Sequence, residues 1–519
     1  MRLAQIITTI LLLSGSATLV KAQSVTAEVA NGKLKGTSLG AINSFKGIPY
    51  ALPPVGALRW KAPQPAKNWK GTRDAMAFAS RAMQKVVYKD MIFRSPGISE
   101  DCLYLNVWAP ARSTGQQLPV LVYFHGGGFS SGDGSEPRYD GQSMAEHGLV
   151  VVTVNYRLGI FGFFTHPDLT AESPNHASGD YGLLDQALAL KWVNKNIAAF
   201  GGDKAKVTIA GQSAGSISVS LQMASPLSKG LFRAAIGESG SILGTNPPVP
   251  LKKAEQLGVE FVAKSGYKNI DALRKIPADS LLDLAVKPGT TFFPVVIDGY
   301  FLPEAPIKIY EHGLQADIPL LAGWTSAEVG YGRLLGAGQP TLDNYRNAVA
   351  NTYGDKSTEV LKLYPAEKDE DVKQVATDLA SDRYLGYSTW KWLDLHGKTN
   401  GFPVYRYMYS QVLPALKGQE QNYTKPIGAP HSADIAYAMG NLKLDSVYAY
   451  TPGDFKTSET MQSYLINFVK TTNPNGPGLP LWSGFQSSIP QVMYLDEHSK
   501  QQGEKNLKRY TLLDQIFNK

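Results

Sequence analysis

The chain has 519 residues, a formal net charge of +7 and a single cysteine. Hydrophobic residues make up 43% of it and charged residues 18%, which excludes global disorder and allows a large buried core. Lys and Arg are scattered, with no basic stripe for nucleic acid. One cysteine excludes a disulfide framework and a cysteine-based zinc site.

The N-terminus predicts an export signal. Arg2 supplies a positive start, residues 6–13 form an apolar stretch, and Val20-Lys21-Ala22 matches a small-residue cleavage site before Gln23. The alternative is an N-terminal helix of the mature fold. The stretch is too short to span a bilayer, and no later segment has eighteen unbroken apolar residues. We therefore expect residues 1–22 to be removed near Ala22, and the exported chain to lack stable membrane insertion.

Apolar runs and helical periods alternate along the rest of the chain. Unalternating β-branched runs are typical of strands buried on both faces of a sheet, and a 3.6-residue apolar period is typical of a helix. In chain order the sequence predicts strands at 118–124 and 148–155, a helix at 183–200, a strand at 206–210, a helix at 214–224, and strands at 234–236, 318–322 and 404–409.

This alternation predicts an α/β fold with a mostly parallel sheet and helices on both faces. No internal repeat, low-complexity tract or linker divides the chain, so residues 23–519 are expected to form a single domain. Residues 52–100 and 240–300 look irregular, and we interpret them as insertions around the sheet where substrate loops would lie.

A Gly-Gln-Ser-Ala-Gly motif at residues 211–215 is the strongest chemical signal. The pattern recurs by chance, but here a buried strand precedes it and a helix follows it, which is the context of a nucleophile turn. Such a turn strains the serine backbone and directs the Ser213 hydroxyl toward the positive end of the next helix. The alternative is a Gly/Ser-rich connection without chemistry.

A serine hydroxyl needs a general base, and the base needs a third group to orient it. In this fold the chain order is serine, acid, histidine, which leaves His396, His431 and His498 as candidates. His396 belongs to a predicted helix C-terminus, where it would favour the helix dipole, and His498 lies in a charged stretch near the end. His431 follows the loop residues 428–430 and is therefore the predicted base.

The orienting acid should follow a buried strand and precede the histidine. Glu328 is the first carboxylate after the predicted strand at 318–322, whereas Asp317 lies before the strand and Asp343 lies fifteen residues further on. An exposed loop charge is the alternative for Glu328. As the acid, it would hold the neutral imidazole in one tautomer and stabilise the imidazolium.

Three glycines after the first long strand predict donors for a developing oxyanion. His125 to Phe129 matches an HGGG-type motif, whose backbone amides act together with the amide of Ala214. A phosphate-binding loop is the other use of such glycines, but no Walker lysine or Ser/Thr follows at the needed spacing.

Taken together, these motifs resemble the type-B carboxylesterase family, also called the carboxylesterase/cholinesterase family. The resemblance covers nearly the whole mature chain and is carried by residues 45–51, 100–108, 154–159, 182–186 and 200–216, together with Glu328 and His431. It implies an α/β-hydrolase fold, a small-molecule ester substrate, and no metal or organic cofactor. It also implies that Ser213, Glu328 and His431 are catalytic and that Gly127, Gly128 and Ala214 form the oxyanion hole.

Three positions depart from the family pattern. The family commonly pairs the cysteine that matches Cys102 with one twenty residues upstream, where this chain has Ala82. Gln212 replaces the usual Glu before the serine, which keeps hydrogen bonding and loses charge. The 82–102 loop holds Tyr88 and Phe93 but lacks the Trp with which cholinesterases bind quaternary ammonium, which argues against choline esters.

The resulting hypothesis is a secreted serine carboxylic-ester hydrolase. The alternatives are a non-catalytic binding protein of the same fold, and an amidase or acyl-transferase that uses the same residues. The run at residues 213–220 is similar to bacterial esterases of the para-nitrobenzyl and mycotoxin-ester type, which points to a bacterial source and bulky esters. The particular ester, its acyl and alcohol preference, the oligomeric state, and the choice between periplasm and exterior stay open.

Overall fold

The computed structural model describes residues 23–88, 90–287, 293–484 and 490–518. The predicted export signal, residues 1–22, lies outside the described residues. Within them, every helix is too short or too polar to cross a membrane.

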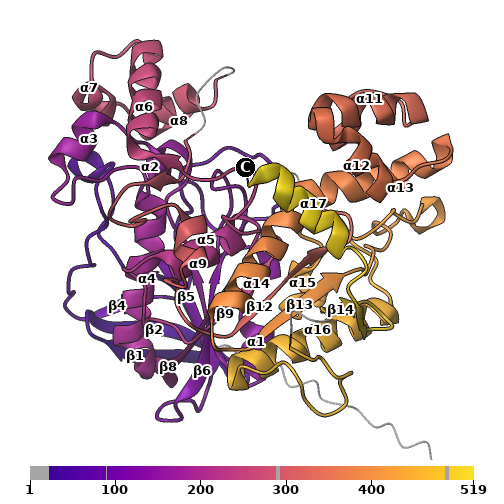
Figure 1. Cartoon of the computed structure of the whole chain (residues 1–519). Helices are drawn as coiled ribbons and strands as arrows, with labels where there is room; N and C mark the ends of the chain where they lie inside the picture. Colours follow the sequence, from indigo (N-terminus) through magenta and orange to yellow (C-terminus); the bar gives the residue numbers. More distant parts are fainter. Residues whose placement is uncertain (1–22, 89, 288–292, 485–489, 519) are drawn as a thin grey trace, which may run out of the picture.

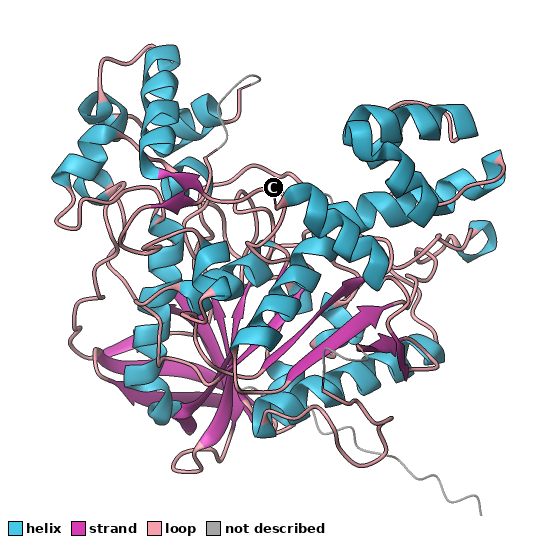
Figure 2. Ribbon diagram, viewed as in Figure 1, coloured by secondary structure: helices cyan, strands magenta, loops and turns pink. Residues whose placement is uncertain are grey.

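One large sheet forms the centre of the described structure (Figures 1 and 2). Its order is β1-β2-β3-β5-β7-β6-β8-β9-β12-β13-β14-β15, with β4 beside β2. The strands are β1 (Gln23–Val29), β2 (Gly32–Leu39), β3 (Ile42–Pro49), β4 (Thr72–Asp74), β5 (Tyr104–Pro110), β6 (Leu118–Phe124), β7 (Val150–Val154), β8 (Gly202–Gln212), β9 (Ala234–Glu238), β12 (Leu320–Thr325), β13 (Val404–Tyr409), β14 (Gln491–Leu495) and β15 (Lys500–Gly503). The central strands from β7 to β14 are parallel, and the pairings toward both ends of the sheet are mainly antiparallel. The predicted mostly parallel sheet is therefore confirmed at its centre.

Helices cover both faces of this sheet, as the sequence predicts. The helices of the described residues are α1 (Gln142–Glu146), α2 (Gly159–Phe163), α3 (Pro167–Glu172), α4 (Tyr181–Asn196), α5 (Ala214–Ala224), α6 (Leu251–Ser265), α7 (Ile270–Lys275), α8 (Ala278–Ala285), α9 (Pro306–Glu311), α10 (Gly332–Leu335), α11 (Leu342–Tyr353), α12 (Ser357–Leu363), α13 (Asp369–Ser381), α14 (Tyr387–Thr399), α15 (Ile435–Ala438), α16 (Pro452–Thr471) and α17 (Leu507–Phe517). Successive residues of β6 show the division of the core. Val122 joins the apolar cluster under α5 and α14, while Tyr123 joins the cluster under α16. This follows from side chains alternating between the two faces of a strand.

The prediction of irregular insertions is wrong for residues 240–300 and holds for most of 52–100. The first region folds into α6, α7 and α8, and its short strand β10 (Val249–Pro250) pairs with β11 (Val296–Ile297). In α6, Ala254, Phe261 and Val262 are buried at helical spacing and pack an apolar stripe onto the body of the protein. Figure 1 shows α6–α8 and α11–α13 as two separate helical groups at the top of the view, above the sheet.

Candidate active site

Ser213 occupies a tight turn between β8 and α5. Its backbone has φ 56° and ψ −121°, a conformation that L-residues adopt at a cost in strain. The turn is crowded, because a Cβ at Gly215 would overlap the carbonyl oxygen of Phe124 on the neighbouring strand. The Ser213 amide donates to the carbonyl of Glu238 at 2.8 Å. The turn therefore holds the half-buried serine hydroxyl directly before the first residue of α5.

The structure brings the predicted serine, histidine and glutamate into one chain of contacts. His431 Nε2 lies 2.9 Å from Ser213 Oγ, and His431 Nδ1 lies 2.5 Å from Glu328 Oε2. The other carboxylate oxygen of Glu328 accepts the backbone N–H of Thr325 at 2.8 Å, and Glu328 is 2% exposed. The carboxylate is thereby fixed on one side by its own strand and on the other by the imidazole.

Two loops carry the acid and the histidine, and they are bonded to each other. Glu328 follows β12 and His431 follows β13, and these two strands are parallel neighbours. Ala327 bridges to Pro430, with its amide donating to the Ala429 carbonyl at 2.9 Å. The carboxyl ends of adjacent parallel strands lie at one edge of the sheet. Glu328 and His431, which are 103 positions apart in the sequence, therefore meet beside Ser213.

The other two candidate histidines lie elsewhere. His396 is completely buried in α14, where Nε2 lies 2.8 Å from the Ile318 carbonyl and Nδ1 lies 3.2 Å from the Gln315 amide nitrogen. Burial lowers its pKa to about 4, so it is a neutral core histidine and not the dipole-stabilising cation suggested by its helix end. His498 is exposed, as predicted.

The contacts at His431 give the imidazole a raised pKa. Burial of the ring lowers the pKa, but the charge of Glu328 and the hydrogen bond to it outweigh burial, so the pKa lies above the ordinary value of 6.5. An imidazole must be neutral to accept the serine proton. We expect kcat/KM to fall as the pH drops through a histidine pKa above about 6.5. A pH–rate profile checks this, and an acid limb below pH 6 would contradict it.

The predicted oxyanion loop presents free donors beside this chain. Within the described residues, the amides of Gly127 and Gly128 donate to no protein acceptor. Ala214 is the first residue of α5, where a helix amide has no partner within the helix. Gly127 has φ 108°, and a Cβ there would overlap the carbonyl of Ser131. The His125 ring stacks on Tyr156 at 4.4 Å, which stiffens the start of this loop.

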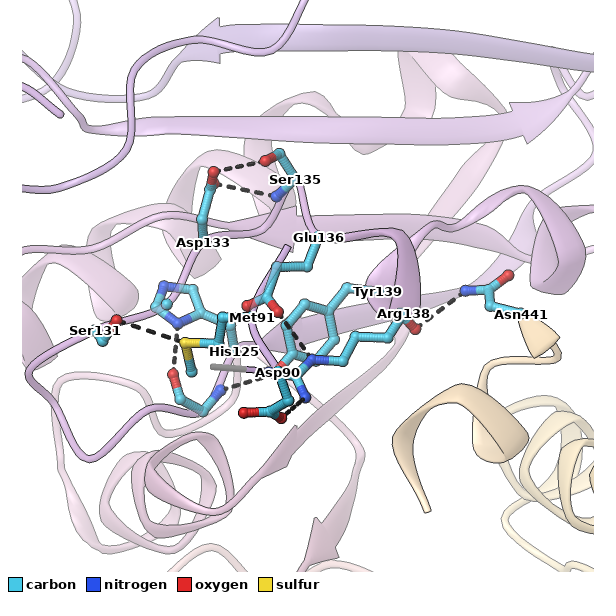
Figure 3. Close-up of polar contacts among 12 residues, drawn as sticks. Asp90, Met91, His125, Ser131, Asp133, Ser135, Glu136, Arg138, Tyr139 and Asn441 are labelled. Carbon is cyan, nitrogen blue, oxygen red and sulfur yellow. Dashed lines mark hydrogen bonds and ion pairs between the residues drawn. The ribbon is translucent and has the colours of Figure 1, made fainter. Parts of the chain in front are cut away.

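The 82–102 loop is joined to the segment at residues 131–140 by ion pairs. Arg94 donates through Nε to the Ser135 carbonyl at 2.6 Å and through a terminal nitrogen to Asp140 at 2.8 Å. Arg138 lies 2.9 Å from both Asp90 and the buried carboxylate of Glu136. Figure 3 draws these contacts as dashed lines. These contacts hold the loop against the segment that follows the glycines predicted to form the oxyanion hole.

Cys102 is buried, as the sequence predicts, and it is a free thiol. Ala82, at the place of the family's second cysteine, is also buried in the same apolar cluster. Burial raises the pKa of the thiol well above its ordinary value, so little thiolate forms at neutral pH. We expect native protein to resist Ellman's reagent and Cys102→Ala to stay active. Rapid modification of folded protein with loss of activity, or a stoichiometric disulfide-linked dimer, would contradict this prediction.

Two side chains that the sequence did not single out as site residues lie close to predicted site residues. Tyr384 comes from a π-helical turn at Asp382–Gly386, and its ring lies edge-to-face with His431 at 6.4 Å. Tyr88 lies in the 82–102 loop, and its hydroxyl is the nearest atom to a Cβ built at Gly128. No periodicity or motif marks Tyr384, because only the tertiary fold brings it to the histidine.

Gln212 packs against the same ring. Its amide nitrogen is 3.3 Å from His431 Nε2 and 3.4 Å from Nδ1, and the residue is 2% exposed. Gln212 stands where the family pattern has Glu before the serine. Its amide makes a polar contact with the imidazole and brings no charge next to it. Within the described residues, no group of three or more His, Cys, Asp or Glu side chains is placed to hold a metal ion.

A cavity of about 460 Å³ opens beside the histidine. Asp90, Glu136 and Arg138 lie at its polar side. Its apolar wall is formed by Ile92, Leu413, Leu444, Val447, Tyr448 and Tyr450. The volume accommodates a bulky group next to the imidazole.

The fold and the site together define an α/β-hydrolase. The model of the "Carboxylesterase family" matches residues 21–512, and the chain belongs to this family. The chain is similar to a fumonisin B1 esterase of Sphingopyxis macrogoltabida, at 35% identity over 480 residues, covering 88% of this chain and 84% of that protein. It is also similar to a para-nitrobenzyl esterase of Bacillus subtilis (strain 168), at 35% identity over 490 residues, covering 90% and 93%.

Solved structures agree with these sequence matches. Two structures of PNB esterase superpose with TM-scores of 0.78 and 0.80 at 32% identity, each covering 94% of this chain and 99% of the solved chain. The predicted type-B carboxylesterase membership and α/β-hydrolase fold are therefore confirmed. The protein is a carboxylic-ester hydrolase that acts on small-molecule esters.

Proposed function

We propose that this protein is an exported serine esterase that works through an acyl-enzyme on Ser213, with His431 as general base and Glu328 as orienting acid. The observation that carries the assignment is the unbroken chain of contacts from Ser213 Oγ through both ring nitrogens of His431 to Glu328. The export and the single domain at residues 23–519 rest on the N-terminal sequence and on the absence of a linker.

The reaction follows from these contacts in two halves. Ser213 Oγ attacks the ester carbonyl while His431 Nε2 takes the hydroxyl proton, and the amides of Gly127, Gly128 and Ala214 stabilise the oxyanion. The imidazolium then gives its proton to the leaving alcohol as the tetrahedral intermediate collapses. Water repeats the sequence on the acyl-enzyme and releases the acid. Glu328 keeps its charge throughout and stabilises the imidazolium.

The substrate class follows from where the cavity lies. The group that His431 protonates is the leaving alcohol, so a cavity lined by His431 receives the alcohol portion of the ester. Its volume and its apolar and tyrosine wall favour a bulky, largely apolar or aromatic alcohol. We therefore propose benzyl-type esters as good substrates. The similarity to a para-nitrobenzyl esterase supports this choice.

Two alternatives use the same fold. A non-catalytic binding protein would have no need of a base positioned on the serine, and the 2.9 Å contact argues against it. An amidase or acyl-transferase would form the same acyl-enzyme. An amidase differs from an esterase in its leaving group, which is an amine, and an acyl-transferase differs in the nucleophile that attacks the acyl-enzyme. No contact among the described residues favours an amine or a second alcohol over water.

The test is covalent labelling combined with an ester panel. A sulfonyl fluoride should modify Ser213 once per chain, by intact mass and peptide mapping, and abolish hydrolysis. Among acetate esters, benzyl-type alcohols should give a higher kcat/KM than methyl or ethyl alcohols. Labelling at another residue would overturn the serine assignment, and equal rates across the alcohols would overturn the substrate class.

A further inference from the structure

The cavity beside His431 carries more negative than positive charge on its walls. Three carboxylates line it, those of Asp90, Glu136 and Asp445. Among the described residues that line the cavity, Arg138 is the only Lys or Arg. Three negative charges against one positive charge leave the lining with a formal net charge of −2 while His431 is neutral. A positively charged group of a ligand is therefore favoured in this cavity.

Glu136 is a buried carboxylate with unused hydrogen-bonding capacity. It is 1% exposed, and within the described residues neither of its side-chain oxygens accepts a hydrogen bond. Its 2.9 Å contact with Arg138 Nε is an ion pair without hydrogen-bond geometry. A buried acceptor without a donor costs free energy. A ligand in the cavity that donates N–H groups to Glu136 would remove this cost.

The guanidinium of Arg138 is already engaged with carboxylates. One terminal nitrogen donates to Asp90 Oδ2 at 2.9 Å, and Nε faces Glu136. Figure 3 draws both carboxylates directed at this guanidinium. An anionic ligand would have to compete with Asp90 and Glu136 for Arg138. A cationic ligand meets no such competition, because a carboxylate has more acceptor sites than one guanidinium contact occupies.

The third carboxylate and two tyrosine rings lie along the same cavity. Asp445 accepts the Val447 amide at 2.6 Å through Oδ1 and the Tyr450 hydroxyl at 2.8 Å through Oδ2, so it is held in place. The rings of Tyr448 and Tyr450 lie 6.0 Å apart in the cavity wall. The face of a tyrosine ring attracts cations. Both features favour a positively charged ligand group, as the net charge does.

We propose that the cavity selects esters whose alcohol portion carries a protonated primary amine, with Glu136 and Asp90 accepting its hydrogen bonds. The proposal rests on the proposed function, because it names a substrate class for the alcohol pocket of that esterase. The apolar wall holds the aromatic or aliphatic part of the alcohol, and the ammonium lies at the polar side. A quaternary ammonium fits less well, because it has no N–H to donate to Glu136.

Paired esters test the preference at pH 8. Burial raises the pKa of Glu136 to about 7, with Arg138 opposing the rise, so the carboxylate is largely ionised at this pH. We expect kcat/KM for para-(aminomethyl)benzyl acetate to exceed that for its neutral isostere, para-ethylbenzyl acetate, about tenfold, mainly through KM. The para-carboxybenzyl ester should be poorer than both. Equal values for the ammonium and ethyl esters, or a preference for the carboxylate, would overturn the proposal.

A quaternary pair tests the hydrogen bonds separately from the charge. The para-(trimethylammoniomethyl)benzyl ester is compared with its neutral isostere, the para-neopentylbenzyl ester. Its preference over that isostere should be smaller than the preference of the primary ammonium over the ethyl ester. A preference of equal size would contradict the role of N–H donation to Glu136 and Asp90.

Variants of the two acids connect the preference to this cavity. The ratio of kcat/KM for the ammonium ester to that for the ethyl ester should fall about tenfold in Glu136→Gln, which keeps the side-chain size and removes the charge. It should fall less, about threefold, in Asp90→Asn, because that side chain is 52% exposed. Asp74→Asn is the matched control. Asp74 lies on β4, is 72% exposed and pairs with Lys35, so its loss should keep the wild-type ratio. A wild-type ratio in Glu136→Gln would overturn the assignment.

Product inhibition of wild-type enzyme keeps the proposal falsifiable if Glu136→Gln fails to fold. The alcohol that carries the aminomethyl group should inhibit competitively at a lower concentration than para-ethylbenzyl alcohol, and equal inhibition would contradict the site. Hydrolysis of the ethyl ester tells the two failures apart. Hydrolysis that persists in Ser213→Ala contradicts the proposed function, whereas hydrolysis that needs Ser213 but shows no ammonium preference contradicts only this inference.

Discussion

Replacing Ser213 or His431 by Ala is expected to lower kcat/KM for an activated ester by roughly 10⁴- to 10⁶-fold while the protein keeps its fold. In the proposed mechanism the serine forms the bond to the acyl group, and the imidazole is the only base in contact with that hydroxyl within the described residues. The serine and the histidine act as one unit, so the double variant should lose little more activity than either single variant. Steady-state kinetics and circular dichroism check both statements.

His498→Ala is the matched control for the histidine, because His498 is exposed and makes no contact with Ser213. It should retain wild-type activity. Full activity in Ser213→Ala would remove the serine from the mechanism. Losses that add up fully in the double variant would show that the two side chains act independently.

Gly127→Ala is expected to lower kcat by about 10²- to 10³-fold, the cost of losing one oxyanion donor. The φ of 108° at this residue is unfavourable for any side chain, and the new Cβ would overlap the Ser131 carbonyl. The loop must shift to relieve the overlap, and its amide then leaves the position where negative charge develops. Binding of a trifluoromethyl ketone, whose serine adduct carries the same oxyanion, should weaken in parallel.

Gly115→Ala provides the control for backbone strain alone. Gly115 has φ 81° in an exposed loop, and a Cβ there would meet nothing within 4 Å. This variant should lose about 1 kcal/mol of stability and no activity. If Gly127→Ala behaved in the same way, with normal kcat and normal ketone binding, Gly127 would have no part in the oxyanion hole.

The parts of the fold that depend on local pattern were predictable. The strand at 118–124 and the helix at 214–224 occur with those bounds. An unbroken apolar run determines the strand locally. The helix contains a glycine and three serines, which are poor helix formers, so its place directly after the tight turn at Ser213 is what made it predictable. The helix predicted at 183–200 ends its α-helical part at Asn196 and finishes as a 3₁₀ turn, Ile197–Phe200. Fold-specific chain order was enough to select Glu328 and His431 from many acids and eight histidines.

What escaped prediction depends on contacts between distant residues. The edge-to-face contact of Tyr384 with His431 exists only once separate segments of the folded chain are adjacent. The helices in 240–300 are a different case. The helical spacing of Ala254, Phe261 and Val262 is visible in the sequence. The Pro and Gly residues around this segment favoured the prediction of an irregular stretch instead.

The 82–102 loop is held by ion pairs where the family resemblance leads us to expect a disulfide, and this changes the conditions on which the loop depends. A disulfide exists only where the surroundings are oxidising, whereas the pairs of Arg94 with Asp140 and Arg138 with Asp90 form equally in a reducing cytoplasm. These contacts therefore need no oxidase or isomerase to form, in whichever compartment the chain folds. The attachment of the loop therefore depends on ionic strength and not on redox potential. Added salt should weaken the Arg138–Asp90 pair most, because the Asp90 side chain is 52% exposed.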